Sequence, residues 1–254
     1  MTHMIILISP AKTFNFNSKD IKVESTESIF MQESQKLVKN LQSLSSNDYQ
    51  KLMGISANLA KLNKDRHFSL GEDNKSSSKE ALFAFRGDVY VSMAPETFSK
   101  SDLTFCQNHL RILSGLYGVL RPFDLIKAHR LEMGTPLKNE RGKNLYEWWG
   151  NKIAGLLNED ICQHKNKFYV NLASDEYFRS VKGLLTEKVI TPIFQERKGD
   201  NFKVVGIHAK KARGLMSAYI IKNQIQNVKE LESFSCNGYK FNGQASNHLK
   251  LVFQ

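Results

Sequence analysis

Cysteine, acidic side chains and long apolar runs are all scarce in this 254-residue sequence. Its three cysteines, Cys106, Cys162 and Cys236, lie far apart and form no CxxC pair. Such spacing argues against a zinc site and suits a reducing compartment. No apolar run reaches the length of a transmembrane helix, and the N-terminus has no signal-peptide pattern. We therefore expect a cytoplasmic protein that has no membrane partner, no bound metal and no cofactor.

The shortage of acidic residues gives the chain a strong positive charge. It has 36 Lys and Arg residues against 25 Asp and Glu residues, and its formal net charge is +11. This excess favours a polyanionic partner, such as nucleic acid, an anionic membrane surface or a phosphorylated substrate. The 41% hydrophobic content is ordinary for a globular protein. Because no repeat or clear linker divides the chain, we interpret residues 1–254 as one domain.

The most basic local segment runs from His208 to Gly214 and reads HAKKARG. The apolar alternation before it, in residues 202–207, predicts a strand. The apolar spacing after Gly214 predicts a helix that begins there. Cations beside a helix start form an anion-binding site, because the first N–H groups are unpaired and the dipole is positive at that end. The alternative is an ordinary solvated turn.

Residues 46 to 66 have the pattern of two short helices joined by a glycine turn. Ser46 can cap the first helix, Gly54 permits the turn, and Ser56 can cap the second helix. The pattern is typical of a helix-hairpin-helix, in which backbone N–H groups of the turn bind a DNA phosphate without reading bases. Lys51 lies beside the turn. Any two packed helices joined by glycine would give a similar pattern.

Other segments predict further strands and helices, but the sequence does not show which of these elements contact one another. Residues 5–8 predict a buried strand, followed by a loop that presents Lys12. A helix capped at Ser99 or Ser101 is expected to continue through Leu113. Residues 189–194 and 203–207 predict a hairpin.

Carboxylates and polar groups near these cations allow a second interpretation, that of an enzyme. Asp88, Glu132, Asp175 and Glu176 are the candidates for general acid or base, since neighbouring cations would tune their ionisation. The alternative is structural: Asp175 would cap a helix, and Glu132 would neutralise Arg130. The sequence contains no nucleophile elbow, Walker loop, dinucleotide fingerprint or metal-ligand cluster, which favours a binding protein over an enzyme.

Five segments, taken together, closely resemble the bacterial YaaA peroxide-stress protein family. The segments follow one another in the same order over nearly the whole chain. They are residues 6–13 (ILISPAKT), 85–90 (FRGDVY), 113–122 (LSGLYGVLRP), 171–177 (NLASDEY) and 209–214 (AKKARG).

The resemblance implies an α+β fold, with a mixed β-sheet surrounded by helices and an embedded helix-hairpin-helix beside a positively charged cleft. It further implies a cytoplasmic protein that binds duplex DNA and limits iron-driven oxidative damage. Carried over by position, the hairpin falls at residues 52–56. From charge and turn context, we expect the DNA-binding residues to be Lys12, Lys51, Gly54, Ser56, Arg86, Arg111, Arg121, Arg130, Lys210, Lys211 and Arg213.

Two hypotheses follow for the function. The first is a protein that binds duplex or branched DNA without base specificity, as a monomer, in the peroxide stress response. The second is an enzyme acting on a phosphate- or nucleotide-containing substrate in the same basic cleft. Direct iron sequestration has little support, because neither the cysteines nor the acidic residues have the grouping that such a site needs.

Overall fold

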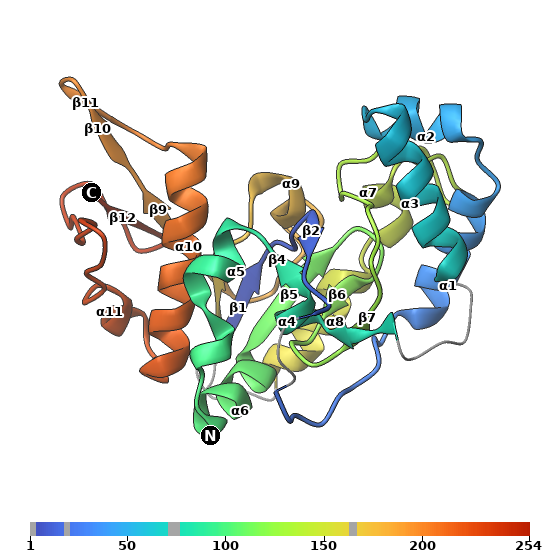
Figure 1. Cartoon of the computed structure of the whole chain (residues 1–254). Coiled ribbons are helices and arrows are strands. Elements are labelled where there is room, and N and C mark those ends of the chain that lie inside the picture. Colours follow the sequence, from blue (N-terminus) through green and yellow to red (C-terminus); the bar gives the residue numbers. More distant parts are fainter. Residues whose placement is uncertain (1–3, 18–20, 71–76, 163–166) are drawn as a thin grey trace.

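A six-stranded sheet forms the centre of the computed structural model, which describes residues 4–17, 21–70, 77–162 and 167–254 (Figure 1). The strand order is β12-β9-β8-β1-β5-β6. Five strands are parallel, and only β6 runs antiparallel to its neighbour β5. The strands are β1 (Ile5–Ile8), β5 (Leu110–Ser114), β6 (Gly118–Leu120), β8 (Phe168–Asn171), β9 (Lys188–Phe194) and β12 (Lys250–Phe253). The predicted α+β class with a mixed sheet is confirmed.

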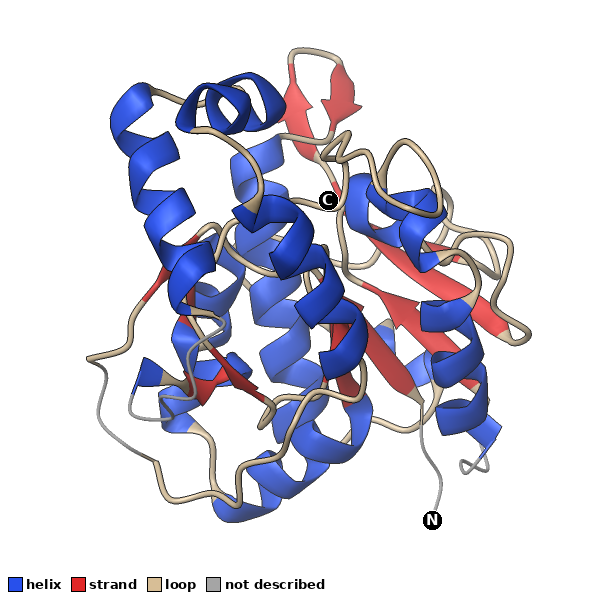
Figure 2. Cartoon of the chain, turned by 90° about the vertical axis from the view of Figure 1, so that its right-hand side faces the viewer, coloured by secondary structure: helices blue, strands red, loops and turns tan. Residues whose placement is uncertain are grey.

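Helices surround this sheet (Figure 2). They are α1 (Met31–Gln42), α2 (Ser46–Met53), α3 (Ala57–Ser69), α4 (Ala81–Ala84), α5 (Asp88–Met93), α6 (Lys100–His109), α7 (Leu145–Trp149), α8 (Lys152–Cys162), α9 (Asp175–Phe178), α10 (Gly206–Lys222), α11 (Val228–Leu231) and the 3₁₀ helix Pro95–Thr97. Three short ribbons complete the described chain. They pair β2 (Thr13–Phe14) with β4 (Phe85–Arg86), β3 (Lys79–Glu80) with β7 (Leu125–Ile126), and β10 (Glu196–Lys198) with β11 (Asn201–Lys203).

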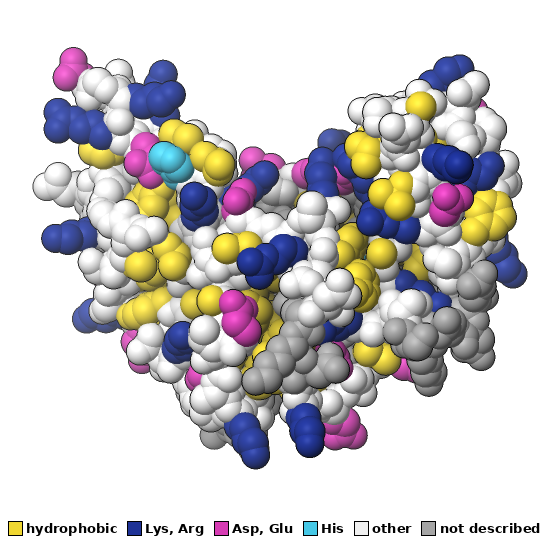
Figure 3. Space-filling view, viewed as in Figure 1, with side chains coloured by type: hydrophobic (Ala, Val, Ile, Leu, Met, Phe, Trp, Pro, Cys, Tyr) yellow, Lys and Arg dark blue, Asp and Glu magenta, His cyan; other side chains and the backbone are white. Residues whose placement is uncertain are grey.

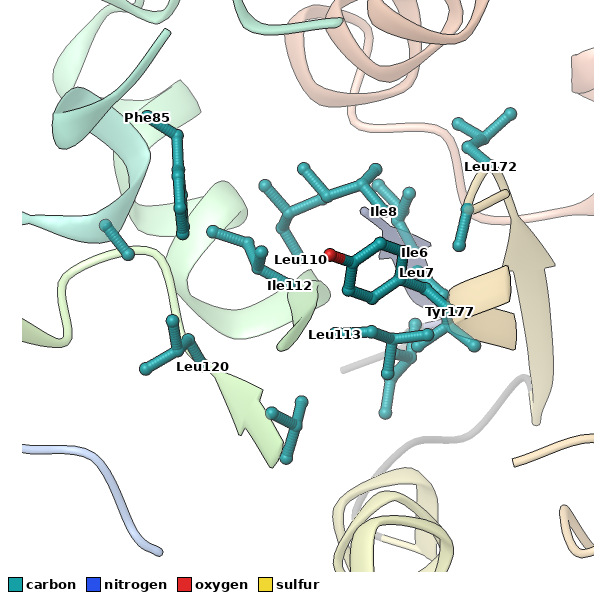
Figure 4. Packing of buried hydrophobic residues seen from close by; sticks show 14 of the residues in the cluster. Ile6, Leu7, Ile8, Phe85, Leu110, Ile112, Leu113, Leu120, Leu172 and Tyr177 are labelled. Carbon is teal, nitrogen blue, oxygen red and sulfur yellow. The ribbon is translucent and has the colours of Figure 1, made fainter. Parts of the chain in front are cut away.

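The core lies on both faces of the central strands. Every residue of β1 and β5 is buried, which explains why residues 5–8 are a continuous apolar run rather than an alternating one. Figure 4 shows Ile6, Ile8, Ile112 and Tyr177 among the side chains that pack in this core. Burial of one such Ile or Leu side chain stabilises the fold by about 1.5–3 kcal/mol.

The molecule has two raised ends with a depression between them. Helices α1, α2 and α3 form one end, on the right in Figure 1, while α10 and the β10–β11 ribbon stand at the other. Figure 3 shows that the surface is hollowed between these ends, and that Lys and Arg side chains lie on both. We call this depression the hollow.

The basic segment lies inside a helix, contrary to the prediction that it precedes one. Helix α10 begins at Gly206, and the strand before it covers only 201–203. Ala, Lys and Arg are strong helix formers, and nothing between Gly206 and Gly214 stops a helix. The cations at 210, 211 and 213 are therefore in the second and third turns, and the predicted anion site at a helix start is wrong.

Two further predictions of secondary structure are wrong because tertiary pairing overrides local pattern. Helix α6 ends at His109, and the next five residues form the buried strand β5 instead of continuing the helix to Leu113. The predicted hairpin of residues 189–194 with 203–207 does not form. Strand β9 lies in the central sheet, parallel to β8, and the hairpin consists of β10 and β11.

Candidate functional site

The glycine turn between α2 and α3 is open to solvent. Gly54 has φ +60°, which is the left-handed conformation that favours glycine, and a Cβ atom built on it would meet nothing within 4 Å. The Ser56 side chain accepts a hydrogen bond from the Leu59 N–H and caps α3. The cap of α2 is Ser45 rather than the predicted Ser46, and Ser45 forms a capping box with Asp48. Two capped helices joined by an exposed glycine are thus present.

A buried polar pair holds α2 against α3. The Tyr49 hydroxyl lies 3.0 Å from Nδ1 of His67, and both side chains are fully buried. Burial lowers the pKa of His67 to about 3, so the ring is neutral at physiological pH. The Gln42 amide in α1 donates to the His67 carbonyl oxygen at 3.0 Å. These contacts make α1, α2 and α3 one connected support for the turn.

Two lysines on the helices that flank the turn are exposed. Lys51 at the end of α2 and Lys61 in α3 are exposed, and the first turn of α3 contains no acidic residue. The positive end of the α3 dipole is therefore not neutralised by its own helix.

A second group of predicted residues converges in a pocket at the carboxyl ends of β1 and β8. The pocket has a volume of about 410 Å³ and collects side chains from four separate parts of the chain. We call it the strand-end pocket. Its charged and hydroxyl-bearing lining residues are Ser9, Lys12, Thr13, Asp88, Tyr90, Ser174, Glu176, Tyr177, Lys210 and Arg213.

The two strand ends beneath this pocket are fastened together by hydroxyl groups. The Ser174 N–H donates to Ser9 Oγ at 2.9 Å, and the Ser9 hydroxyl donates to Ser174 Oγ at 3.3 Å. The Tyr90 hydroxyl of α5 donates to the Ser9 carbonyl oxygen at 3.1 Å. The sequence analysis did not identify Ser9 or Tyr90 as site residues. Their positions in the sequence could have indicated them. Ser9 directly follows a buried strand, and Tyr90 lies in the segment 85–90, which is one of the five that carry the family resemblance.

Glu132 is the shared counter-ion of two predicted DNA-binding cations. Its Oε1 lies 2.9 Å from Lys12 Nζ and 3.0 Å from an Arg130 guanidinium nitrogen. Burial raises the pKa of Glu132, but the hydrogen bond from Lys12 and the charge of Arg130 outweigh this and hold the pKa below its ordinary value. Glu132 is therefore an ionised structural partner, and this geometry fits the structural interpretation of the Glu132–Arg130 pair.

The other acidic candidates differ in how they are held. Glu176 Oε1 accepts a hydrogen bond from the Gly134 N–H at 2.9 Å, which fixes it at the pocket wall. Asp175 is exposed in the first turn of α9, whose cap residue Ser174 makes no side-chain cap bond. Asp88 lines the pocket, and its carboxylate has no hydrogen-bond or ion-pair partner among the described residues.

Arg213 is a half-buried cation without a close anionic partner. Burial lowers the pKa of Arg213, and the more distant charge of Asp175 partly opposes this effect. Within the described ranges, the guanidinium group forms no hydrogen bond and no ion pair. Lys210 and Lys211 lie exposed on the same helix, and the ammonium groups of both are likewise unpaired in the part of the chain that the structure describes.

Three other predicted arginines lie outside the strand-end pocket. Arg111 is only 7% exposed and is held by Asp160 at 2.7 Å and by two backbone carbonyl groups. Arg121 pairs with the buried Asp124 at 3.0 Å and donates to the Glu27 carbonyl oxygen. Arg86 is exposed on β4 and lines a different pocket, together with Glu96. Arg111 and Arg121 are therefore held in ion pairs within the fold.

The described residues lack two further kinds of feature, a metal site and a membrane-spanning helix. No cluster of three or more His, Cys, Asp or Glu side chains there has the arrangement of a metal site. None of the helices in the same ranges has the length and apolar character needed to cross a membrane.

Comparison with known proteins places the whole chain in one family. Residues 4–245 match the family described as "Peroxide stress protein YaaA". A protein of Saccharophagus degradans described as "UPF0246 protein" is 47% identical over 252 residues, which cover 98% of each chain. Proteins with the same description from Teredinibacter turnerae and Alcanivorax borkumensis are 44% and 45% identical, over 98% and 99% of this chain and 98% of each relative. The chain therefore belongs to the peroxide stress protein YaaA family.

Proposed function

We propose that this protein binds duplex or branched DNA without base specificity, as a cytoplasmic monomer, during the peroxide stress response. A role in that response fits its family. The observation that carries the DNA proposal is the exposed, left-handed Gly54 turn between two capped helices. In this proposal, α2, the Gly54 turn and α3 together act as a helix-hairpin-helix.

The proposed contact at the turn uses backbone rather than base recognition. The first N–H groups of α3 have no partner within the helix, and the helix dipole favours an anion at this end. Ser56 satisfies one of these groups, and the others remain available to a phosphate. Lys51 adds a nearby positive charge. Contacts of this kind position a duplex without specifying its sequence.

The second proposed contact lies across the hollow, on α10. Lys210 and Lys211 are exposed there without anionic partners in the described chain, so they can release counterions from DNA. The two raised ends of the molecule would then contact backbone phosphates on either side of the hollow (Figure 3). Lys12 and Arg130 contribute less, because both are paired with Glu132, and about five to eight phosphate contacts are expected in all. Any effect on iron-driven damage is then indirect, through the DNA that the protein covers.

A salt titration of duplex binding tests this proposal. For five to eight contacts, log affinity should fall with log salt concentration at a slope of about −4.5 to −7. The double variant K210Q/K211Q should bind more weakly on all sequences, with a slope shallower by about 1.8. K229Q/K240Q removes the same charge at two other exposed positions and is the matched control. Identical affinities and slopes for the wild type and K210Q/K211Q would overturn the proposal.

The second candidate function is an enzyme that acts on a phosphate- or nucleotide-containing substrate. One observation favours it: Asp88 lines the strand-end pocket beside Lys210 and Arg213, with a carboxylate unpaired within the described residues. Such a carboxylate can act as a general base. The test is release of inorganic phosphate from nucleotides by the wild type and by D88N. An equal rate in both would exclude Asp88 from catalysis.

A further inference from the structure

The parallel strands are arranged so that their order reverses between β1 and β8. Numbered along the chain, β1, β5, β8, β9 and β12 lie in the spatial order 2-1-3-4-5. The chain leaves β1 toward β5 on one side, and later returns to β8 on the other side. In open sheets of this kind, small ligands bind outside the carboxyl ends of the strands at the point of reversal.

The strand-end pocket occupies this point. Strand β1 ends at Ile8, and strand β8 ends at Asn171. The pocket residues Ser9 and Leu172 follow those ends directly, and Ser174 lies two residues after Leu172. Its volume of about 410 Å³ is in the range of small-molecule sites. The hydrogen bonds between Ser9 and Ser174 give it a fixed floor, so it is formed before any ligand arrives.

The charges of the pocket call for a ligand with an anionic group. Arg213 is half-buried and unpaired within the described ranges, and withdrawing a charge from water without a partner is costly. Lys210 lies one helical turn earlier, on the same face of α10. Lys12 is already paired with Glu132. Arg213 and Lys210 are therefore the groups available to a phosphate.

The same pocket also contains carboxylates, which a bare phosphate would not favour. Asp88 and Glu176, in the first turns of α5 and α9, both line it, and carboxylates accept hydrogen bonds from the hydroxyl groups of a ribose. Apolar lining from Pro10, Val89 and Leu172 offers a surface for a base. The ligand that matches all three features carries a phosphate, sugar hydroxyls and a flat apolar group.

We propose that the strand-end pocket binds a nucleoside 5′-monophosphate, with its phosphate on Arg213 and Lys210 and its sugar hydroxyls on Asp88. The ligand is a free ribonucleotide, because the nucleotide at the 5′-phosphorylated end of a DNA strand has no free sugar hydroxyl to donate to Asp88. The site is separate from the Gly54 turn. It names the ligand of the pocket on which the second candidate function depends, and it does not require DNA binding through the turn.

Isothermal titration of the full chain tests the proposal, with adenosine 5′-monophosphate as the probe. Adenosine and inorganic phosphate should each bind at least about tenfold more weakly, since each lacks one part of the ligand. R213Q and K210Q should each weaken binding of the monophosphate by about tenfold or more. D88N should weaken binding of the monophosphate without weakening that of inorganic phosphate, because the removed carboxylate repels a bare phosphate.

Matched controls separate this site from general charge effects. K203Q removes an exposed lysine and R197Q removes an exposed arginine, both on the β10–β11 ribbon; neither residue lines the pocket. Both variants should bind the monophosphate like the wild type. Circular dichroism of R213Q is the control for folding. Absence of monophosphate binding to the wild type at millimolar concentration, or wild-type affinity in R213Q, would overturn the proposal.

Two further experiments identify the source of the ligand and show whether the pocket proposal and the DNA-binding proposal fail independently. If a short 5′-phosphorylated DNA oligonucleotide competes with the monophosphate and its 5′-hydroxyl counterpart does not, the pocket binds the 5′ phosphate without sugar hydroxyls, and the contact of the sugar with Asp88 is overturned. If neither competes, the ligand is a free nucleotide. G54V should retain the wild-type affinity for the monophosphate whatever happens to its affinity for duplex DNA. A parallel loss of monophosphate binding in G54V would contradict the separation of the two sites.

Discussion

Gly214 of α10 lies against Val89 of α5 so closely that a Cβ atom at position 214 would come within 2.1 Å of the Val89 carbonyl oxygen. The two helices are therefore in backbone contact at this point. Arg213 is the preceding residue on α10, and Asp88 is the preceding residue on α5. The close approach thus sets the positions of both side chains at the strand-end pocket.

Gly214→Ala should destabilise the protein, because the added methyl group forces α10 away from α5. Overpacking of this kind costs about 1–3 kcal/mol, or more where backbone is the obstacle. Gly155→Ala in α8 is the control, since a Cβ there meets nothing within 4 Å; it should be neutral or stabilise by up to about 1 kcal/mol. Urea unfolding measures both. Equal unfolding free energies for the two variants would contradict the packing argument.

Glu132 should mask the contribution of Lys12 to anion binding, because the two side chains are already paired at 2.9 Å. In the wild type, K12Q is expected to lower duplex affinity by less than about twofold. In an E132Q background, where Lys12 is free, K12Q should lower it by about fivefold or more, which is coupling of about 0.5–1 kcal/mol. Fluorescence anisotropy at low salt gives the four affinities. Equal effects of K12Q in both backgrounds would show that the pair does not restrain Lys12.

Acid stability should depend on Glu33, whose carboxylate lies 2.8 Å from Arg141 and 2.5 Å from Lys152. Burial raises its pKa, but these two cations outweigh burial and lower it from 4.5 to about 2. The native state thus favours the ionised form. Its stabilising effect is complete above pH 4.5 and is lost as the pH falls toward 2.

The variant E33Q should therefore be less stable than the wild type at neutral pH, with a difference that shrinks below pH 4.5. Thermal unfolding between pH 7 and pH 2.5 measures this difference. E24Q changes an exposed glutamate and should follow the wild type throughout. A difference between E33Q and the wild type that stays constant with pH would exclude the ion pairs as its cause.

Helices and strands that depend on neighbouring residues could be predicted from the sequence, whereas those that depend on distant pairing could not. The α2–α3 unit depends on serine caps and a left-handed glycine that lie within a few residues of one another, so its pattern was visible. The run Ile5–Ile8 was recognisable because a strand buried on both faces has no polar residues. Strand β5 was not, since Leu110–Ser114 continues a helical pattern and becomes a strand only by pairing with β1.

The sequence predicted some of the residues that form the site, but it did not predict how they are arranged in space. Uncompensated cations recur along the sequence, and three of them, Lys12, Lys210 and Arg213, do line one pocket. The partner of Arg111 is Asp160, 49 residues away, so no local signal could mark that arginine as structural. Ser9 and Ser174 are 165 residues apart, and only the parallel pairing of β1 with β8 brings them together.

The central claim is that the Gly54 turn holds a DNA phosphate through its backbone, and duplex affinity in the variant G54V tests it most directly. A β-branched side chain strains a residue at φ +60°, so the turn should distort and affinity should fall without any loss of charge. G238V places the same strain at φ +85° in another open turn and is the matched control. We predict a loss of about tenfold or more for G54V, as expected when one phosphate contact is removed, and wild-type affinity for G238V. Equal affinities for G54V, G238V and the wild type would contradict the account.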